Sequence, residues 1–175
     1  PAQRYKGGVY DRTITETVLP AAPAGQFRSI SYDEMRDVVH HLAAGFRDLG
    51  VSAGKRVALF AHTRMEWAQT DFGVLAAGGV VTTVYPESSE RKVSYLLADP
   101  DATGVVLEGD EHLERVLAVE DELDLEFVVQ MDRPGSGDAS AGFDAAAVLD
   151  ERDDVLTLAE VHDRGAALYR PEEYD

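Results

Sequence analysis

Hydrophobic positions along the 175-residue chain follow two spacings. After residue 29, segments with an apolar residue every three or four positions, typical of amphipathic helices, alternate with short apolar runs that are typical of buried strands. The predicted helices cover about residues 31–49, 63–77, 89–98 and 111–119, and the predicted strands 56–61, 80–84, 103–108 and 126–131. This alternation predicts an α/β fold with mostly parallel strands and helices on the faces of the sheet.

Helix start and stop signals support several of these elements. Ser31 and Glu34 have the spacing of a capping box, in which each side chain satisfies a backbone amide at the start of a helix, and Thr63 with Glu66 has the same spacing. Glycine often ends a helix because it adopts positive φ without strain. One glycine of the pair at 78–79 is therefore expected to take positive φ, since the chain passes there directly from a helix into a strand.

Pattern and composition divide the chain into four parts. The parts are an N-terminal β-hairpin with a loop (1–29), the α/β core (30–131), a flexible loop (132–142) and a helical tail (143–175). The hairpin turn is expected at Gly7-Gly8, between short runs that contain Tyr5 and Tyr10. The tail carries two weaker helical patterns, at 143–150 and 155–164.

The charge of the chain is strongly negative, because 33 acidic residues face 16 basic ones and the net charge is −17. Such a charge opposes binding to nucleic acid and to anionic membrane surfaces. The acidic residues are spread through periodic segments instead of forming one disordered block. With only three lysines among the basic residues, we interpret this composition as adaptation to a salt-rich cytoplasm, as in halophilic archaea.

The chain contains no cysteine, which excludes disulfides and thiolate metal sites and favours a cytoplasmic protein. No apolar run approaches the roughly 20 residues of a membrane span, so no span is predicted. The first residue is Pro1 instead of Met, which suggests a partial chain.

The individual motifs do not indicate a phosphate-binding or a metal-binding site. Residues 50–56 resemble a phosphate loop, but the spacing is one residue short, Arg56 replaces the required Ser or Thr, and a strand follows where a helix should. The histidine pair 40–41 lies on one helix, where adjacent side chains point to different faces and cannot chelate one ion. The other histidines (His62, His112 and His162) fall on separate elements, so no metal site is predicted.

Two further features are interpreted as structural. Trp67 lies on a helix face with Val74 and is expected in the core. The acidic run 150–154 is expected to be the solvated start of a helix. No G-x-G-x-x-G or G-x-S-x-G motif occurs, and the residues alone show no complete catalytic constellation.

Three stretches in a fixed order carry a family resemblance. They are ISYDEM (30–35), GVSAGKRVALFAHTRMEWAQTDFGVLAAGGVVTTVYPESS (50–89) and VSYLLADPDATGVVLE (93–108). Together they resemble the start of an AMP-forming acyl-CoA synthetase of the adenylate-forming superfamily, over about residues 27–131. RMEW (64–67) and Tyr85-Pro86 followed by Ser88-Ser89 are most similar to the long-chain fatty acid–CoA ligase branch.

The resemblance implies a two-step reaction for a full-length parent enzyme. A carboxylate attacks the α-phosphate of ATP to give acyl-AMP and pyrophosphate, and the thiol of CoA then displaces AMP. The family's phosphate loop follows a segment similar to PEEYD (171–175), where this sequence stops. The chain is therefore expected to be an N-terminal fragment that has no catalytic residue and is inactive alone.

The same resemblance sets the expected ligands and partners. ATP, Mg²⁺ and CoA are cofactors of the parent, and none is expected to bind this fragment. Tyr85, Pro86, Ser88 and Ser89 are expected near the wall of the acyl-binding subdomain. The expected partners are the rest of the same polypeptide and, in the parent, a fatty acid, with a homodimer as a further possibility.

Two alternatives remain open from the sequence. A medium-chain or aryl acid–CoA ligase would share the same first segment, because the floor of the acyl pocket lies beyond residue 175. A stand-alone, non-catalytic α/β binding module would need no phosphate loop at all.

The charge generates a prediction about salt. At a net charge of −17, self-repulsion opposes folding, and the Debye length falls from about 10 Å at 0.1 M to about 3 Å at 1 M salt. We expect the melting temperature to rise continuously from about 0.1 to about 3 M KCl, because an excluded salt also strengthens apolar burial. Melting curves measure this directly, and a flat or falling midpoint would remove the interpretation as salt adaptation.

Overall fold

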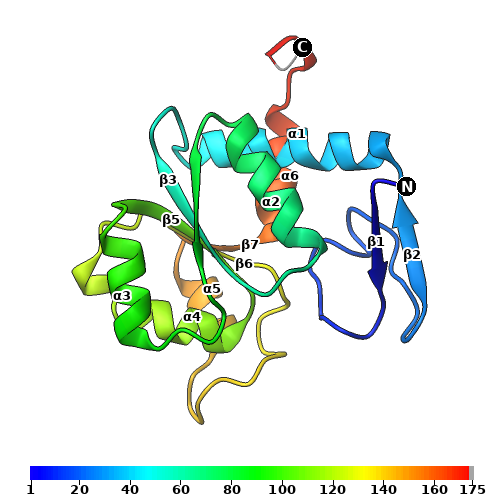
Figure 1. Ribbon diagram of the computed structural model, residues 1–175. Helices are drawn as coiled ribbons and strands as arrows, with labels where there is room; N and C mark the ends of the chain where they lie inside the picture. The colour runs from blue at the N-terminus through cyan, green and yellow to red at the C-terminus, as the bar shows by residue number, and fades with distance from the viewer. Residues whose placement is uncertain (174–175) are drawn as a thin grey trace.

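Five parallel strands form the central sheet of the computed structural model, which describes residues 1–173 (Figure 1). The strands are β3 (Arg56–Phe60), β4 (Val80–Val84), β5 (Ala102–Leu107), β6 (Phe127–Gln130) and β7 (Val155–Thr157). Their order across the sheet is β4-β3-β5-β6-β7, and each neighbouring pair is parallel. The predicted α/β fold with mostly parallel strands is confirmed.

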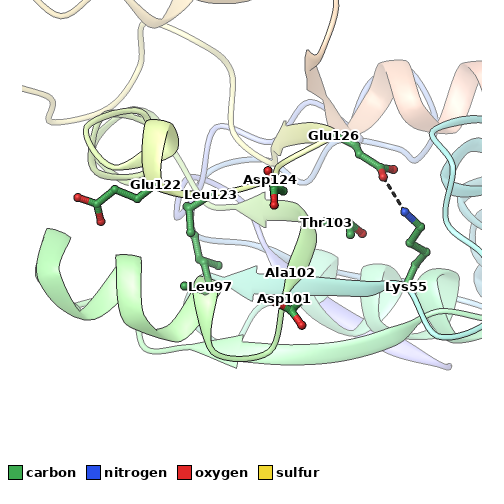
Figure 2. Close-up of a pocket in the computed structure, with 10 residues that line it drawn as sticks. Lys55, Leu97, Asp101, Ala102, Thr103, Glu122, Leu123, Asp124 and Glu126 are labelled. Carbon is green, nitrogen blue, oxygen red and sulfur yellow. Dashed lines mark hydrogen bonds and ion pairs between the residues drawn. The ribbon is translucent and has the colours of Figure 1, made fainter.

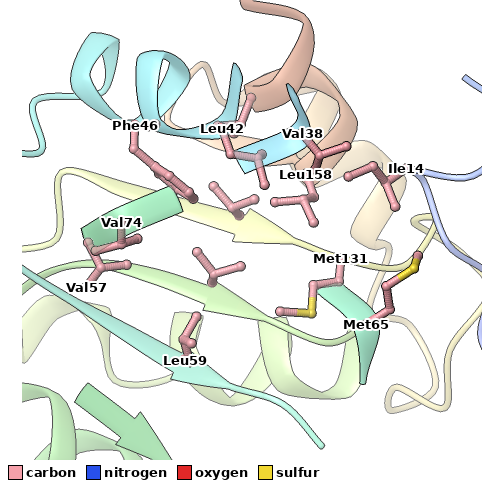
Figure 3. Close-up of a cluster of buried hydrophobic side chains, with 14 of the residues drawn as sticks. Ile14, Val38, Leu42, Phe46, Val57, Leu59, Met65, Val74, Met131 and Leu158 are labelled. Carbon is pink, nitrogen blue, oxygen red and sulfur yellow. The ribbon is translucent and has the colours of Figure 1, made fainter. Parts of the chain in front are cut away.

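Helices cover both faces of this sheet. One face carries α1 (Tyr32–Asp48), α2 (Met65–Ala76) and α6 (Leu158–Leu168), and the other carries α3 (Glu90–Ala98), α4 (Asp110–Leu117) and α5 (Ala145–Glu151). Successive residues of a strand point to opposite faces, so Val57 and Leu59 join the first core, and Ala58 and Phe60 join the second. Figure 3 shows the first core, where side chains of α1, α2 and α6 meet the strands.

The strand order creates a switch point between β3 and β5. From β3 the chain crosses through α2 to β4 at one edge, then returns through α3 to β5 on the other side of β3. Helix α2, which connects β3 to β4, and helix α3, which connects β4 to β5, lie on opposite faces of the sheet. In doubly wound sheets a crevice opens at such a point, outside the carboxyl ends of the strands, and ligands bind there.

Two of the predicted signals at helix ends are confirmed, and one is wrong. Ser31 and Glu34 form the capping box of α1, and Gly78 takes positive φ (94°) where α2 gives way to β4. The predicted box of Thr63 and Glu66 is wrong, because α2 begins one residue later with Arg64 as its N-cap, without a side-chain cap. Glu66 is fully buried and binds arginine side chains instead.

The tail beyond residue 142 contains a strand that the sequence did not reveal. Residues 155–157, predicted as helix, form β7, which pairs with β6, and α6 follows with a capping box of Thr157 and Glu160. The acidic run 150–154 is also not a helix start, since α5 ends at Glu151 and the chain turns into β7. A three-residue strand is too short to show a period. Tyr174 and Asp175, the end of the predicted tail, lie outside the described residues.

The N-terminal antiparallel pair is present, but its second strand is not the predicted one. β1 (Gln3–Lys6) pairs with β2 (Phe27–Ile30), so the predicted tight turn at Gly7-Gly8 is wrong. The intervening residues form a long excursion that Tyr5 helps to hold through a hydrogen bond from its hydroxyl to the carbonyl of Pro20. η1 (Glu120–Glu122) and η2 (Pro171–Glu173) are short 3₁₀ turns. Within residues 1–173, no helix has the length and apolar character needed to cross a membrane.

The first half of the loop at 132–142 is attached to α4. The carboxylate of Asp110 accepts hydrogen bonds from the amides of Gly135 (3.0 Å) and Gly137 (3.2 Å) and from the side chain of Gln130 (2.7 Å). The predicted flexibility of this loop stays a prediction.

Two glycines let α1 and α6 approach closely. A Cβ atom added at Gly45 would collide with the carbonyl oxygen of Val161, and one added at Gly165 would collide with the carbonyl oxygen of His41. Both obstacles are backbone atoms of the facing helix, which cannot rotate away as a side chain would. The contact between the two helices therefore depends on the absence of a side chain at these positions.

This contact predicts that Gly165→Ala destabilises the fold. Overpacking costs about 1–3 kcal/mol and the collision here is with backbone, while alanine regains about 1 kcal/mol of helix propensity. We expect a net loss of about 2 kcal/mol in the free energy of unfolding by urea. Gly109→Ala is the matched control, because Gly109 has extended φ (−155°) and an added Cβ would meet its nearest neighbour at 3.9 Å. Equal losses in the two variants would contradict the account of the helix contact.

Candidate functional site

The carboxyl edge of β3 and β4 contains a cavity of about 350 Å³. One wall is the segment that leaves β3, and the other is the end of β4 with the turn that follows it. Its lining residues are Ala61, His62, Thr63, Trp67, Thr83, Val84, Tyr85, Pro86 and Glu87. Trp67, expected in the core, is half-buried and lines this cavity while it packs on the first core.

The four predicted site residues divide into two pairs. Tyr85 and Pro86 line the cavity, and Tyr85 is 81% exposed. Ser88 is buried and lies outside the lining. Ser89 is the exposed N-cap residue of α3, although its hydroxyl makes no capping hydrogen bond. The structure therefore brings two of the four residues to the cavity.

Arg115 of α4 holds the turn that carries these residues. Its Nη1 donates hydrogen bonds to the carbonyl oxygens of Pro86 (3.0 Å) and Ser88 (3.3 Å), and the amide of Ser88 donates to the carbonyl oxygen of Tyr85 (2.9 Å). The guanidinium thus fixes the backbone of the turn from the neighbouring helix. No sequence pattern pointed to Arg115, because its partners are backbone atoms far away in the chain.

His62 lies between two carboxylates at the switch point. Its Nδ1 is 3.0 Å from Oε1 of Glu108, which directly follows β5, and its amide donates to Oε2 of the same residue at 3.0 Å. Its Nε2 is 3.3 Å from Oε1 of Glu87 on the far wall of the cavity. Burial by itself lowers the pKa of His62, but the hydrogen bonds and charges of Glu108 and Glu87 outweigh burial and raise it.

A buried guanidinium lies beside this histidine. Arg64 binds both oxygens of Asp132, at 3.0 and 2.7 Å, and its Nε donates to Glu66 at 2.9 Å. Glu108 lies 3.8 Å from Nη1. Burial alone would lower the pKa of Arg64, but the carboxylates of Asp132 and Glu66 raise it, so the side chain stays charged.

The N-terminal segment joins the same network. Arg12 Nε lies 2.7 Å from Glu66 Oε1, in an ion pair that lacks the alignment of a hydrogen bond. The ring of Tyr10 stacks on Arg64, with the guanidinium carbon 3.9 Å from the ring centroid. Arg133 pairs with Asp11 at 3.3 Å. The carboxyl edge of the sheet is therefore covered by residues from the start of the chain.

A larger cavity, of about 390 Å³, lies at the opposite edge of the sheet (Figure 2). It is lined by the amino end of β5 and by acidic residues that include Asp101, Asp124 and Glu126. Lys55 is the cation in this lining, and its Nζ binds Glu126 at 2.6 Å. Since ligands of doubly wound sheets bind at the carboxyl edge, we assign the candidate site to the smaller cavity.

The histidines form two pairs that the sequence did not reveal. His41 Nδ1 lies 3.1 Å from His162 Nε2 across the α1–α6 contact, and burial lowers the pKa of both. The ring of His112 lies edge-on to Phe60, and its centroid is 6.5 Å from that of His62. Within residues 1–173, no group of three or more His, Asp or Glu side chains has a metal-binding arrangement.

At the carboxyl edge, the charged side chains described above are paired with one another. Their role is therefore to position the walls of the cavity. Arg64, Glu66 and His62 were not predicted as site residues. A usable signal was present, because His62 and Glu108 directly follow two neighbouring parallel strands, and polar residues at strand ends meet at one edge of the sheet.

The fold and the switch-point edge define a doubly wound α/β domain, and comparison with known families specifies it further. Residues 11–164 match the model of the family described as AMP-binding enzymes. This match covers most of the chain, and the chain belongs to that family. The resemblance to AMP-forming acyl-CoA synthetases inferred from the sequence is confirmed.

The similar proteins point to one branch of that family. The chain is 38% identical over 88 residues to the long-chain-fatty-acid–CoA ligase FadD15 of Mycobacterium bovis, covering 50% of this chain and 15% of that protein. It is 30% identical over 94 residues to the long-chain-fatty-acid–CoA ligase ACSBG1 of Rattus norvegicus, covering 54% of this chain and 13% of that protein. The aligned part therefore spans only about a seventh of these curated relatives.

A solved structure supports the fold independently. The A-PCP didomain of the carboxylic acid reductase from Segniliparus rugosus, in complex with AMP, superposes with a TM-score of 0.73. The match covers 97% of this chain and 25% of that structure, at 19% sequence identity. At this identity the likeness shows the fold alone.

Proposed function

We propose that this chain is the N-terminal part of a long-chain fatty acid–CoA ligase that converts ATP, a fatty acid and CoA into acyl-CoA, AMP and pyrophosphate. The observation that carries the proposal is the similarity to long-chain ligases from bacteria and animals, within a family match over residues 11–164. The aligned segment includes only a small share of those enzymes, so the proposed role of this part is structural: it supplies a sheet and a cavity wall.

The amino edge of the sheet does not fit the nucleotide. Lys55, the lysine of the stretch that resembles a phosphate loop, is paired with Glu126 at the amino edge of the sheet. That edge is acidic and would repel a triphosphate. We therefore assign ATP, Mg²⁺ and CoA to the rest of the proposed parent polypeptide, and no step of the reaction to residues 1–173.

For the acyl group, we propose that the turn from Tyr85 to Ser89 contributes a wall of its binding region. The support is that Tyr85 and Pro86 line the cavity at the carboxyl edge and that Arg115 holds their backbone. Ser88 and Ser89 would act by shaping this turn, because neither lines the cavity.

Several other properties belong to the same proposal. We place the parent in the cytoplasm, and salt adaptation and a homodimer stay predictions. An archaeal source also stays a prediction, and the two ligases compared above come from a bacterium and an animal. The division into 1–29, 30–131, 132–142 and 143–175 is likewise a prediction. A medium-chain or aryl acid ligase, or a binding module without catalysis, stays an alternative that the long-chain relatives do not favour.

The proposal predicts that the 175-residue chain alone does not catalyse fatty-acid-dependent exchange of pyrophosphate into ATP. The reason is that the 175 residues contain no Thr-Ser-Gly-rich run ending in Pro-Lys-Gly, the phosphate loop that the family resemblance implies for the parent. Labelled-pyrophosphate exchange with palmitate measures this, with circular dichroism to show that the chain is folded and FadD15 assayed in parallel as the active control.

Exchange above background with the purified chain would contradict the assignment of catalysis to the rest of the polypeptide. The coding sequence just downstream separates the remaining alternatives. A Thr-Ser-Gly-rich run ending in Pro-Lys-Gly supports the ligase, whereas a stop codon directly after Asp175 supports the binding module.

A further inference from the structure

His62 joins the two walls of the cavity at the carboxyl edge. One ring nitrogen contacts Glu108 (3.0 Å), which directly follows β5 and lies outside the lining, and the other contacts Glu87 on the opposite wall (3.3 Å). The three side chains differ in exposure: Glu108 is 12% exposed, His62 is 48% exposed and Glu87 is 76% exposed. The contact with Glu87 is therefore the one that water reaches most easily.

The chemistry of imidazole couples these two contacts to one proton. A neutral imidazole has one N–H, so only one ring nitrogen can donate, while the imidazolium donates from both. Glu108 keeps the hydrogen bond in the neutral form, because it also accepts from the backbone amide of His62. Loss of the proton then leaves the lone pair of Nε2 facing the carboxylate of Glu87, which is repulsive.

The other charged groups around His62 do not alter this coupling. Arg64, at the start of α2, lies 3.8 Å from Glu108 and stays charged. His112 of α4 faces the ring of His62, and burial lowers the pKa of His112, which favours its neutral form. Glu108 and Glu87 are the carboxylates in contact with the two ring nitrogens.

We propose that His62 is a positioning residue, a latch that closes the cavity between β3 and β4 when its ring is protonated and releases Glu87 when its ring is neutral. Arg115 holds the carbonyls of Pro86 and Ser88 by hydrogen bonds that do not involve His62. The backbone of the turn therefore stays anchored, while the side of the turn that faces the cavity responds to pH.

The direction of the response follows from linkage. Pairing with carboxylates raises the pKa of His62, so the latch is closed below that pKa and opens as the pH rises through it. Reciprocally, removal of the charge on Glu87 must lower the pKa of His62. In the proposed parent enzyme, the latch would set the width of the acyl-binding region. That consequence rests on the proposed function, whereas the latch itself does not.

The test is an NMR titration of the 175-residue chain from about pH 5 to pH 9, at about 0.1 M salt. The His62 ring and the backbone amides of Tyr85, Glu87 and Ser88 are followed together. We expect the three amides to shift with the same midpoint as His62. In E87Q we expect a lower His62 midpoint and amides that no longer follow it, and in E108Q a lower midpoint with the amides still coupled.

E90Q is the matched control, since it removes the same charge from the exposed first residue of α3. E87Q alters an exposed side chain and is expected to fold. The latch is overturned if the amides do not follow His62, or if E87Q shifts the His62 midpoint no more than E90Q does. No readout involves ATP or fatty acid, so this result is independent of the exchange assay.

Discussion

The buried guanidinium of Arg64 is the interaction on which the carboxyl edge of the sheet depends. Its side chain is fully excluded from water. It binds Glu66 at the start of α2 and both oxygens of Asp132, which lies just beyond β6, and Glu108 is close by. A buried charge is stable only when it is paired and hydrogen-bonded, because the desolvation penalty is several kcal/mol per ion. This pairing determines where three segments meet.

The network also explains why the start of the chain belongs to the same unit as the sheet. Glu66 receives a second guanidinium from Arg12, and the ring of Tyr10 lies over Arg64. These contacts bring the excursion between β1 and β2 onto the edge where the cavity lies. The net charge of −17 is tolerated because the carboxylates buried here are matched by arginines, while most other acidic residues lie toward solvent.

Local patterns predicted the core elements and missed the contacts between distant segments. The strand at 56–61 and the capping box of Ser31 and Glu34 were predictable because period and cap chemistry are local properties. Glu66 has the sequence spacing of a capping-box residue. In the structure its carboxylate instead forms a buried ion pair with Arg12, which lies in a distant segment, so it does not cap α2. β7 was missed because three residues carry no period. At the site, Tyr85 and Pro86, which the family resemblance singled out, line a cavity, and their role at the acyl wall stays a prediction. His62 and Arg115 required the three-dimensional arrangement.

The measurement that tests this account most directly is the free energy of unfolding of R64M compared with R36M. Arg36 pairs with Asp33 and Asp37 at the exposed surface of α1, so R36M removes the same charge without burial. Breaking a buried pair costs about 3–5 kcal/mol, whereas exposed pairs contribute about 0–1 kcal/mol. The account predicts a loss of about 3–5 kcal/mol for R64M, with faster amide hydrogen exchange at the carboxyl edge, and less than about 1 kcal/mol for R36M. Equal, small losses in the two variants would contradict the central role of Arg64.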